Sequence, residues 1–284
     1  MALTISCPGT ATYNAAMVKI SQPSGASAGT VIYTTGGGNN HFYQDNFVHG
    51  PDAINPVVAA GFTAVQTEFT SPTGWLDRTV NGVTGSQGGP LVASCRWATL
   101  AAWVYANVRS NNEPFCATGN SGGSAAIGYA LARFGEDQLF DYVQPSGGPA
   151  LSRVDYGCLC DPTITGPTNC IGTTGYCYGI DAALFGDPSY GNSNCSNHVA
   201  SDAPIWHMDS ILSSDGKSLL NYRTRVHFMF GQLDLTPNPA QGYLWETSIT
   251  STHDAECVAG ADHMIADTVS GAQAVATRMI SNCH

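Results

Sequence analysis

The serine at position 121 lies in a pattern that favours nucleophilic chemistry. It is the centre of Gly119-Asn120-Ser121-Gly122-Gly123, with a short apolar segment before it and an Ala-rich segment after it. A serine at a tight strand-to-helix turn projects its hydroxyl from the backbone surface, and its unusual φ/ψ costs roughly 1–3 kcal/mol. Flanking glycines remove the Cβ atoms that would clash in such a turn. The pattern predicts Ser121 as a nucleophile, and the structural alternative is an ordinary helix N-cap.

The chain contains a second Gly-x-Ser-x-Gly pentapeptide, which serves as an internal comparison. It is centred on Ser27 and lies in the turn-forming run 21–29. The segment that follows it, Thr30–Thr34, has the β-branched and aromatic residues of a strand rather than a helix. We therefore interpret Ser27 as a loop serine, because only Ser121 has a strand before it and a helix after it.

A serine hydroxyl needs a base within hydrogen-bond reach, and that base needs a carboxylate to orient it. Asp234 follows the apolar strand candidate 225–230, and His263 follows the last strand candidate, 255–258. Both positions correspond to loops at the carboxyl ends of strands. Asp234 has an alternative role in an Asx turn, and His263 has one as a surface residue. Less well placed alternatives for the acid are Asp209, Asp215 and Asp254, and the main alternative for the base is His253; His207 reads as a helix residue near the core that could line the pocket.

The elbow at Ser121, the acid loop at Asp234, the base loop at His263 and the order of the elements together resemble the α/β-hydrolase superfamily. The resemblance covers most of the chain outside a Cys-rich segment, and it indicates no particular subfamily. It implies that Ser121 is the nucleophile, that His263 acts first as general base and then as general acid, and that Asp234 orients the imidazole.

The same resemblance implies an oxyanion hole made of two backbone N–H groups. One belongs to the residue after the nucleophile, Gly122. The other comes from the loop after an early strand, where residues 35–38 resemble the His-Gly-Gly-Gly loop of lipases and esterases, with Thr35 in place of the histidine. Gly37 or Gly38 is then the second donor, and the structural alternative is a flexible turn.

Several aromatic residues are candidates for an acyl or alcohol pocket, because ligand sites are mostly apolar. Tyr43 is favoured since it follows the predicted oxyanion loop, and Trp75 and Trp206 are further candidates. The alternative for all three is the hydrophobic core, where most aromatic side chains lie. Other aromatic residues expected near the site are Phe42, Tyr176 and Tyr178.

The composition excludes several classes of partner. The 284 residues carry a net charge of −11, and Lys19 and Lys217 are the only lysines. Nucleic acids and anionic membranes attract basic surfaces, so neither is expected as a partner. The longest apolar run, around residues 97–108, is shorter than the roughly 20 residues of a membrane span. The predicted chemistry needs no metal and no organic cofactor, and the sequence leaves the oligomeric state open.

Ten cysteines suggest disulfides and an oxidising compartment, with the pairing left open. We therefore expect a mature secreted protein that starts with an added initiator Met. The alternative is a zinc site made of Cys158, Cys160, Cys170 and Cys177, whose spacing lacks paired Cys-x-x-Cys units. A single glycosylation sequon, Asn194-Cys195-Ser196, is present.

Strand and helix patterns alternate along one predicted α/β domain, 1–284. This order predicts a mostly parallel sheet with helices on both faces. Residues 13–20 and 30–34 read as an opening hairpin. The segment 150–201 lacks periodicity and holds five cysteines, so we expect a disulfide-stapled insertion, cap or lid. Further strands are expected at 62–69, 115–118, 139–144, 225–230 and 255–258, and helices at 96–108, 124–134, 239–248 and 272–281.

The sequence therefore predicts a secreted serine hydrolase that cleaves carboxylic esters through an acyl-enzyme. A peptidase, an amidase or an acyltransferase would use the same three residues. A non-catalytic binding protein on a hydrolase scaffold is the alternative of a different class. The ester itself, whether plant-polymer, lipid, polyester or small molecule, is left open.

Overall fold

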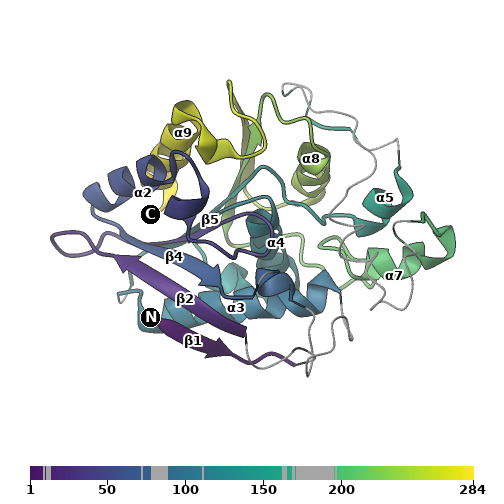
Figure 1. Ribbon diagram of the computed structural model, residues 1–284, viewed down its shortest axis with the longest axis horizontal. Helices are drawn as coiled ribbons and strands as arrows, with labels where there is room; N and C mark the ends of the chain where they lie inside the picture. Colours follow the sequence, from purple (N-terminus) through teal and green to yellow (C-terminus); the bar gives the residue numbers. More distant parts are fainter. Residues whose placement is uncertain are drawn as a thin grey trace.

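The fold is built on one mixed β-sheet. The computed structural model describes residues 1–8, 10, 14–71, 73–77, 89–110, 112–161, 165–167, 170, 195 and 197–284. Within them the strand order is β1-β2-β4-β3-β5-β6-β7-β8. Figure 1 shows β1, β2 and β4 side by side at one edge of the sheet. The strands are β1 (Ala2–Ile5), β2 (Asn14–Ser21), β3 (Thr30–Thr34), β4 (Thr63–Phe69), β5 (Phe115–Asn120), β6 (Tyr142–Ser146), β7 (Arg225–Gly231) and β8 (His253–Val258).

Helices connect the strands and cover the sheet. The α-helices are α1 (Tyr43–Asn46), α2 (Gly50–Ala59), α3 (Pro90–Asn107), α4 (Gly122–Phe134), α5 (Val154–Leu159), α7 (Ala203–Met208), α8 (Asn238–Ser248) and α9 (Val269–Asn282). Short 3₁₀ segments are η1 (Gly74–Leu76), η2 (Glu136–Gln138), η4 (Ala200–Asp202) and η5 (Ile265–Asp267). The strands from β3 and β4 through to β8 pair in parallel, and β1 and β2 are antiparallel. The predicted fold class is confirmed.

The predicted opening hairpin is wrong. β2 and β3 are not neighbours, because β4 lies between them. Val65 of β4 faces Ile20 of β2 across an antiparallel ladder and Ile32 of β3 across a parallel one. The turn-forming residues 22–29 therefore connect strands that are two positions apart. Tyr13, the first residue of the predicted hairpin, lies outside the described residues.

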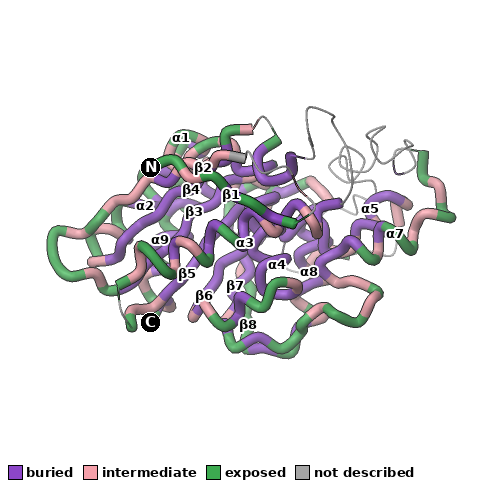
Figure 2. Tube along the Cα trace, turned by 90° about the horizontal axis from the view of Figure 1, so that it is seen from below, coloured by how far each residue is buried: buried purple, intermediate pink, exposed green. Residues whose placement is uncertain are grey.

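The central strands are buried on both faces, so their residues alternate between two cores. On β3, Ile32 packs into the core beneath α3 and α4, whereas Val31 and Tyr33 pack into the core beneath α2 and α9. All five residues of β3 are buried, as expected for a parallel strand covered on both sides. Figure 2 shows this buried interior along the central strands, with exposed residues on the outer loops.

The predicted helices form with small differences. α3 begins at Pro90, earlier than expected, because proline is well suited to the first turn of a helix. One side of α3 is exposed at Ala102 and Ala106, so the helix covers a sheet face rather than lying fully inside. α4 ends at Gly135, whose φ of 71° is the left-handed conformation that commonly ends a helix at a glycine.

Disulfides connect distant parts of the chain, as the cysteine content predicts. Four bonds lie within the described residues: Cys7–Cys95, Cys116–Cys283, Cys158–Cys195 and Cys170–Cys257. Cys160 is disulfide-bonded as well. These bonds occupy cysteines that the zinc alternative would need. Most of the segment 150–201, including its sequon residues Asn194 and Ser196, lies outside the described residues.

No helix within the described ranges combines the length and the apolar character needed to cross a bilayer.

Two carboxyl groups give the fold opposite pH dependences. Glu136 is 6% exposed, and burial raises the pKa of its carboxyl well above 4.5. Partial burial also acts to raise the pKa of Glu256, but His227 and Arg278 outweigh this effect and lower it to about 2. His227 Nε2 lies 3.5 Å from one Glu256 oxygen, and Arg278 donates hydrogen bonds to the other.

We predict that Glu136→Gln stabilises the protein at neutral pH and that Glu256→Gln destabilises it. A raised folded-state pKa means that stability falls as pH rises above about 4.5, the ordinary glutamate value, so removing the Glu136 carboxyl prevents that fall. A lowered folded-state pKa means that the Glu256 contribution is present above about 4.5 and is lost as pH falls towards 2.

Thermal unfolding of both variants between pH 3 and 8 measures the two effects. At pH 7 the midpoint is expected to rise by about 2 °C or more for Glu136→Gln and to fall for Glu256→Gln. Both differences from wild type should shrink at the acidic end. A Glu136→Gln midpoint below that of wild type at pH 7 would contradict the burial argument.

Candidate active site

Ser121 sits at a sharp turn between β5 and α4. Its backbone has φ 54° and ψ −114°, a strained conformation for a residue with a Cβ. Its N–H donates to the Ser146 carbonyl at 2.8 Å, which ties the turn to the end of β6. The Ser121 side chain makes no capping hydrogen bond to α4. This geometry differs from that of an ordinary N-cap, which has an extended backbone and a hydroxyl bonded to the helix.

Glycines allow neighbouring backbones to approach the turn closely. A Cβ at Gly123 would lie 2.5 Å from the Thr35 carbonyl oxygen, and a Cβ at Gly122 would overlap the Gly37 carbonyl. The loop after β3 therefore packs directly against the start of α4. The sequence signal for this contact is the pair of glycine runs, 36–38 and 122–123.

The structure brings Asp234 and His263 together. His263 Nδ1 lies 2.9 Å from Asp234 Oδ2, across a separation of 29 residues. Asp234 follows β7 and is fully buried, whereas the His263 side chain, after β8, is 22% exposed. A buried carboxylate on Nδ1 fixes the ring orientation and leaves Nε2 as the nitrogen that can exchange protons.

The other oxygen of Asp234 forms an Asx turn. Asp234 Oδ1 accepts hydrogen bonds from Thr236 N at 2.8 Å and from Thr236 Oγ1 at 2.6 Å. Asp234 therefore forms the Asx turn with Oδ1 and contacts His263 with Oδ2, and its role as the orienting acid stays a prediction. The turn holds the carboxylate plane in place while Oδ2 faces the imidazole.

Asn238 is a site residue that the sequence analysis missed. Its Nδ2 donates to Thr236 Oγ1 at 2.9 Å and lies 3.2 Å from both ring nitrogens of His263. Because the Thr236 hydroxyl donates to Asp234, the amide atom that approaches it is the NH₂ group. Asn238 is 1% exposed, so its amide packs in a fixed position against the imidazole.

Within the described residues, no hydrogen bond joins the side chains of Ser121 and His263. In free enzymes such contacts are often long and tighten only when substrate binds. The two loops are connected instead through the residue before Ser121, since Asn120 Nδ2 donates to the His263 carbonyl at 3.1 Å. Asn120 is a second residue that the sequence analysis missed.

The two glycine runs present unused backbone donors beside Ser121. Within the described residues, no hydrogen bond is made by the N–H groups of Gly36, Gly37, Gly38 or Gly122, whereas Thr35 N donates to Asn39 Oδ1. The first N–H groups of a helix have no partner within the helix, which explains Gly122. An oxyanion hole requires free N–H donors, and the hole itself, with Gly122 and either Gly37 or Gly38 as its donors, stays a prediction.

A second contact holds the loop after β3 in place. Trp75 N donates to the Gly38 carbonyl at 2.8 Å, and the buried Arg96 donates to the Trp75 carbonyl at 2.8 Å and also to the Asp77 carbonyl. The backbones of Gly38 and Gly74 are in direct contact, so a Cβ on either glycine would overlap the backbone of the opposite segment. The loop is therefore fixed on both sides, by α4 and by η1.

The alternative residues for the three roles have other partners. Ser27 Oγ donates to the Gly29 carbonyl at 2.8 Å in its loop. Asp209 accepts from Leu91 N, Asp215 pairs with Arg133, and Asp254 pairs with Arg225 and His227. His253 begins β8, so it lies at the opposite end of that strand from His263. His207 lies on α7.

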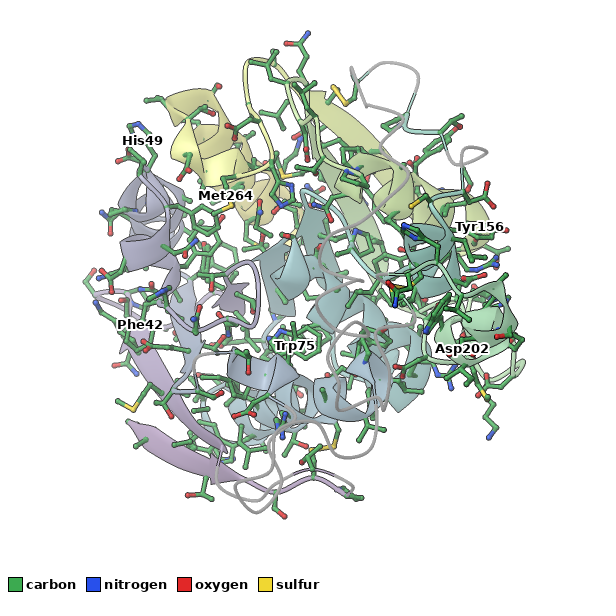
Figure 3. The ribbon with its side chains drawn as sticks, turned by 45° about the vertical axis from the view of Figure 1, so that its right-hand side comes forward. Phe42, His49, Trp75, Tyr156, Asp202 and Met264 are labelled. Atoms are coloured by element: carbon green, nitrogen blue, oxygen red, sulfur yellow. A yellow bond between two sulfur atoms is a disulfide. The ribbon has the colours of Figure 1, made fainter. Side chains whose placement is uncertain are left out.

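The aromatic pocket candidates are buried. Tyr43 and Trp75 are 0% exposed and Trp206 is 2% exposed, which places their side chains in the core. Burial also raises the pKa of the Tyr43 hydroxyl. Figure 3 labels Trp75 near the centre of the molecule and Met264 on the base loop. A pocket role for the three aromatics stays a prediction, and Tyr176 and Tyr178 lie outside the described residues.

Among the described residues, no group of three or more His, Cys, Asp or Glu side chains is arranged to hold a metal ion.

Comparisons with known proteins support the fold. No protein-family model and no curated protein matches the chain. The structure is similar to a thermostable carboxyl esterase from Bacillus coagulans, with TM-score 0.61 and 14% identity over 99% of this chain and 96% of that one. A lipase in its open form gives 0.60 and 14%, over 100% and 98%. A dienelactone hydrolase from Anabaena variabilis gives 0.57 and 13%, over 100% and 98%. The chain has the α/β-hydrolase fold.

We predict that Thr236→Val slows the reaction of Ser121 with a fluorophosphonate by roughly tenfold. The variant lacks the hydroxyl that donates to Asp234 and so no longer holds the carboxylate against His263. Thr236→Ser keeps the hydroxyl and is expected to react within about twofold of wild type. Time-resolved labelling measured by intact-protein mass spectrometry gives the rates. Equal rates for the valine and serine variants would show that the hydroxyl does not support the pair.

Proposed function

We propose that this protein is a secreted serine hydrolase that cleaves carboxylic esters, with Ser121 as nucleophile, His263 as base and Asp234 as orienting acid. The observation that carries the proposal is the buried Asp234 carboxylate, 2.9 Å from His263 Nδ1, at the same edge of the sheet as the strained Ser121 turn. The similar structures include a carboxyl esterase and a lipase, which favours ester chemistry over other uses of the same residues.

The reaction begins when His263 Nε2 removes the hydroxyl proton of Ser121 as Oγ attacks the ester carbonyl. The carbonyl π electrons move to oxygen, and that oxyanion is stabilised by the N–H of Gly122 and by that of Gly37 or Gly38. The intermediate collapses when the C–O bond to the alcohol breaks and the imidazolium gives its proton to the leaving oxygen. An acyl-enzyme on Ser121 and a free alcohol result.

Water completes the cycle. His263 takes one proton from water as the hydroxide adds to the acyl carbonyl, and the oxyanion forms again in the same hole. When the bond to Ser121 Oγ breaks, the imidazolium returns the proton to the serine, and the carboxylic acid leaves. Asp234 stays ionised throughout and stabilises the imidazolium that forms in each half-reaction.

Secretion is part of the proposal. The four described disulfides need an oxidising compartment to form and persist. The net charge of −11 suits a neutral ester better than a polyanionic one, because a negative surface repels anions.

Ser121→Ala is expected to lower kcat for p-nitrophenyl acetate by about 10⁴-fold or more without changing the unfolding midpoint by more than a few degrees. Ser27→Ala is the matched control, since Ser27 occupies the same pentapeptide in a loop, and it should retain wild-type activity. The proposal fails if Ser121→Ala keeps its activity, or if Ser27→Ala alone loses it.

Substrate selection separates the ester hydrolase from the other uses of the site. A panel of p-nitrophenyl esters and peptide amides, with water or an added alcohol as acceptor, distinguishes an esterase from a peptidase or an acyltransferase by its products. Ester hydrolysis to the free acid is the expected outcome. Absence of both turnover and fluorophosphonate labelling would favour a non-catalytic binding protein instead.

A further inference from the structure

Asn120 links the nucleophile turn to the loop that carries His263. Its side chain is fully buried at the end of β5. Asn120 Nδ2 donates to the His263 carbonyl at 3.1 Å, and Asn120 Oδ1 accepts from Ile265 N at 3.2 Å. Since an amide N–H can only donate, the Ile265 contact fixes which amide atom is the oxygen. One side chain thus makes two oppositely directed bonds to the backbone on both sides of Met264.

The remaining contacts of this amide come from its neighbours. Ser146 Oγ, at the end of β6, lies 3.3 Å from Asn120 Oδ1 and 3.1 Å from the Gly119 carbonyl oxygen. The Met264 sulfur lies 3.7 Å from Asn120 Nδ2. The Asn120 amide is therefore held in place by Ser146 at the end of β6, and it in turn holds the loop that carries His263.

The base loop crosses the ends of several strands, and close backbone contacts position it there. Gly147 follows β6 with φ 54°, and a Cβ on it would lie 2.5 Å from the His263 carbonyl oxygen. A Cβ at Gly231, the end of β7, would overlap the Asp262 carbonyl. These glycines permit the approach of the loop but do not bond to it.

Asn120 supplies the bonds that the glycines lack. Within the described structure, the other side chains that hydrogen-bond the backbone of residues 263–265 belong to the same segment, namely Asp262 and Thr268. Asn120 comes from a different element, 143 residues before His263. It therefore ties this loop to the sheet rather than only shaping it internally.

We propose that Asn120 is a positioning residue that sets the distance between Ser121 and His263. It is covalently next to Ser121, so the two bonds fix the His263 main chain relative to the nucleophile, while Asp234 separately fixes the imidazole ring. This role rests on the proposed hydrolase function. It explains why an amide is buried where an apolar side chain would avoid the cost of desolvation.

The kinetic test compares Asn120→Ala with Thr118→Val. Thr118 is equally buried on the same strand, two residues earlier. Its hydroxyl donates to the Gln144 carbonyl at 3.1 Å and not to the loop that carries His263. For Asn120→Ala we expect kcat for p-nitrophenyl acetate to fall about 10- to 100-fold with KM within about twofold, since a misplaced base costs rate rather than binding. Thr118→Val should change kcat by no more than about twofold.

Asn120→Asp separates the two bonds. It keeps an acceptor for Ile265 N but has no donor for the His263 carbonyl, so Ile265 should stay protected while kcat still falls. Hydrogen exchange measured by NMR reports the protection of the Ile265 amide in wild type and in each variant. Loss of protection is expected in Asn120→Ala only.

The outcomes separate this inference from the function on which it rests. Wild-type protein without esterase activity overturns the proposed function. Active wild type together with Asn120→Ala that keeps kcat within threefold, or that loses no more than Thr118→Val does, overturns the positioning role. If the Asn120 variants do not fold, rapid exchange of Ile265 in active wild type overturns it, because the inferred bond is then not maintained in solution.

Discussion

The position of Ser121 depends on close contact between backbones. Its positive φ is tolerated because β5, α4 and the loop after β3 meet there through glycines, whose missing side chains let carbonyl groups pack against the turn. That contact also packs the two glycine runs, whose N–H groups include unbonded donors, against the Ser121 turn. The strain at Ser121 and the predicted oxyanion hole are thus two consequences of one packing arrangement. A side chain at Gly122 or Gly123 would disturb both.

The sheet gives this arrangement a rigid base. Parallel strands end at one edge, so residues that follow β5, β7 and β8 come together although they are far apart in sequence. The Cys116–Cys283 disulfide adds a covalent link between β5 and the end of α9. The strand that precedes Ser121 is therefore held by its neighbours in the sheet and by the C-terminal segment. A scaffold of this kind suits a site whose groups must keep a fixed separation.

Local sequence patterns were sufficient for the fold class and for placing two of the three candidate residues, Asp234 and His263, in contact. The predicted helices and the strands around Ser121 form close to the expected residues, because periodicity and glycine positions are local signals. The pairing of β2 was not predictable in the same way. β4 displaces the expected hairpin partner, and only non-local packing decides which strand lies beside which. Likewise, the burial of Tyr43 and Trp75 depends on contacts that no local pattern records.

The residues that support the acid were also missed, although their spacing carries a signal. Asp234, Thr236 and Asn238 occupy alternate positions in the turn from β7 into α8. The turn gives the three side chains one task each: the carboxylate orients His263, the hydroxyl holds the carboxylate, and the amide lies against the ring. The Asx turn, which the sequence offers as an alternative to a chemical role for Asp234, is what allows the three side chains to have separate tasks. A turn motif beside a predicted acid therefore adds to the case for that acid, since the same bonds that form the turn fix the carboxylate for its partner.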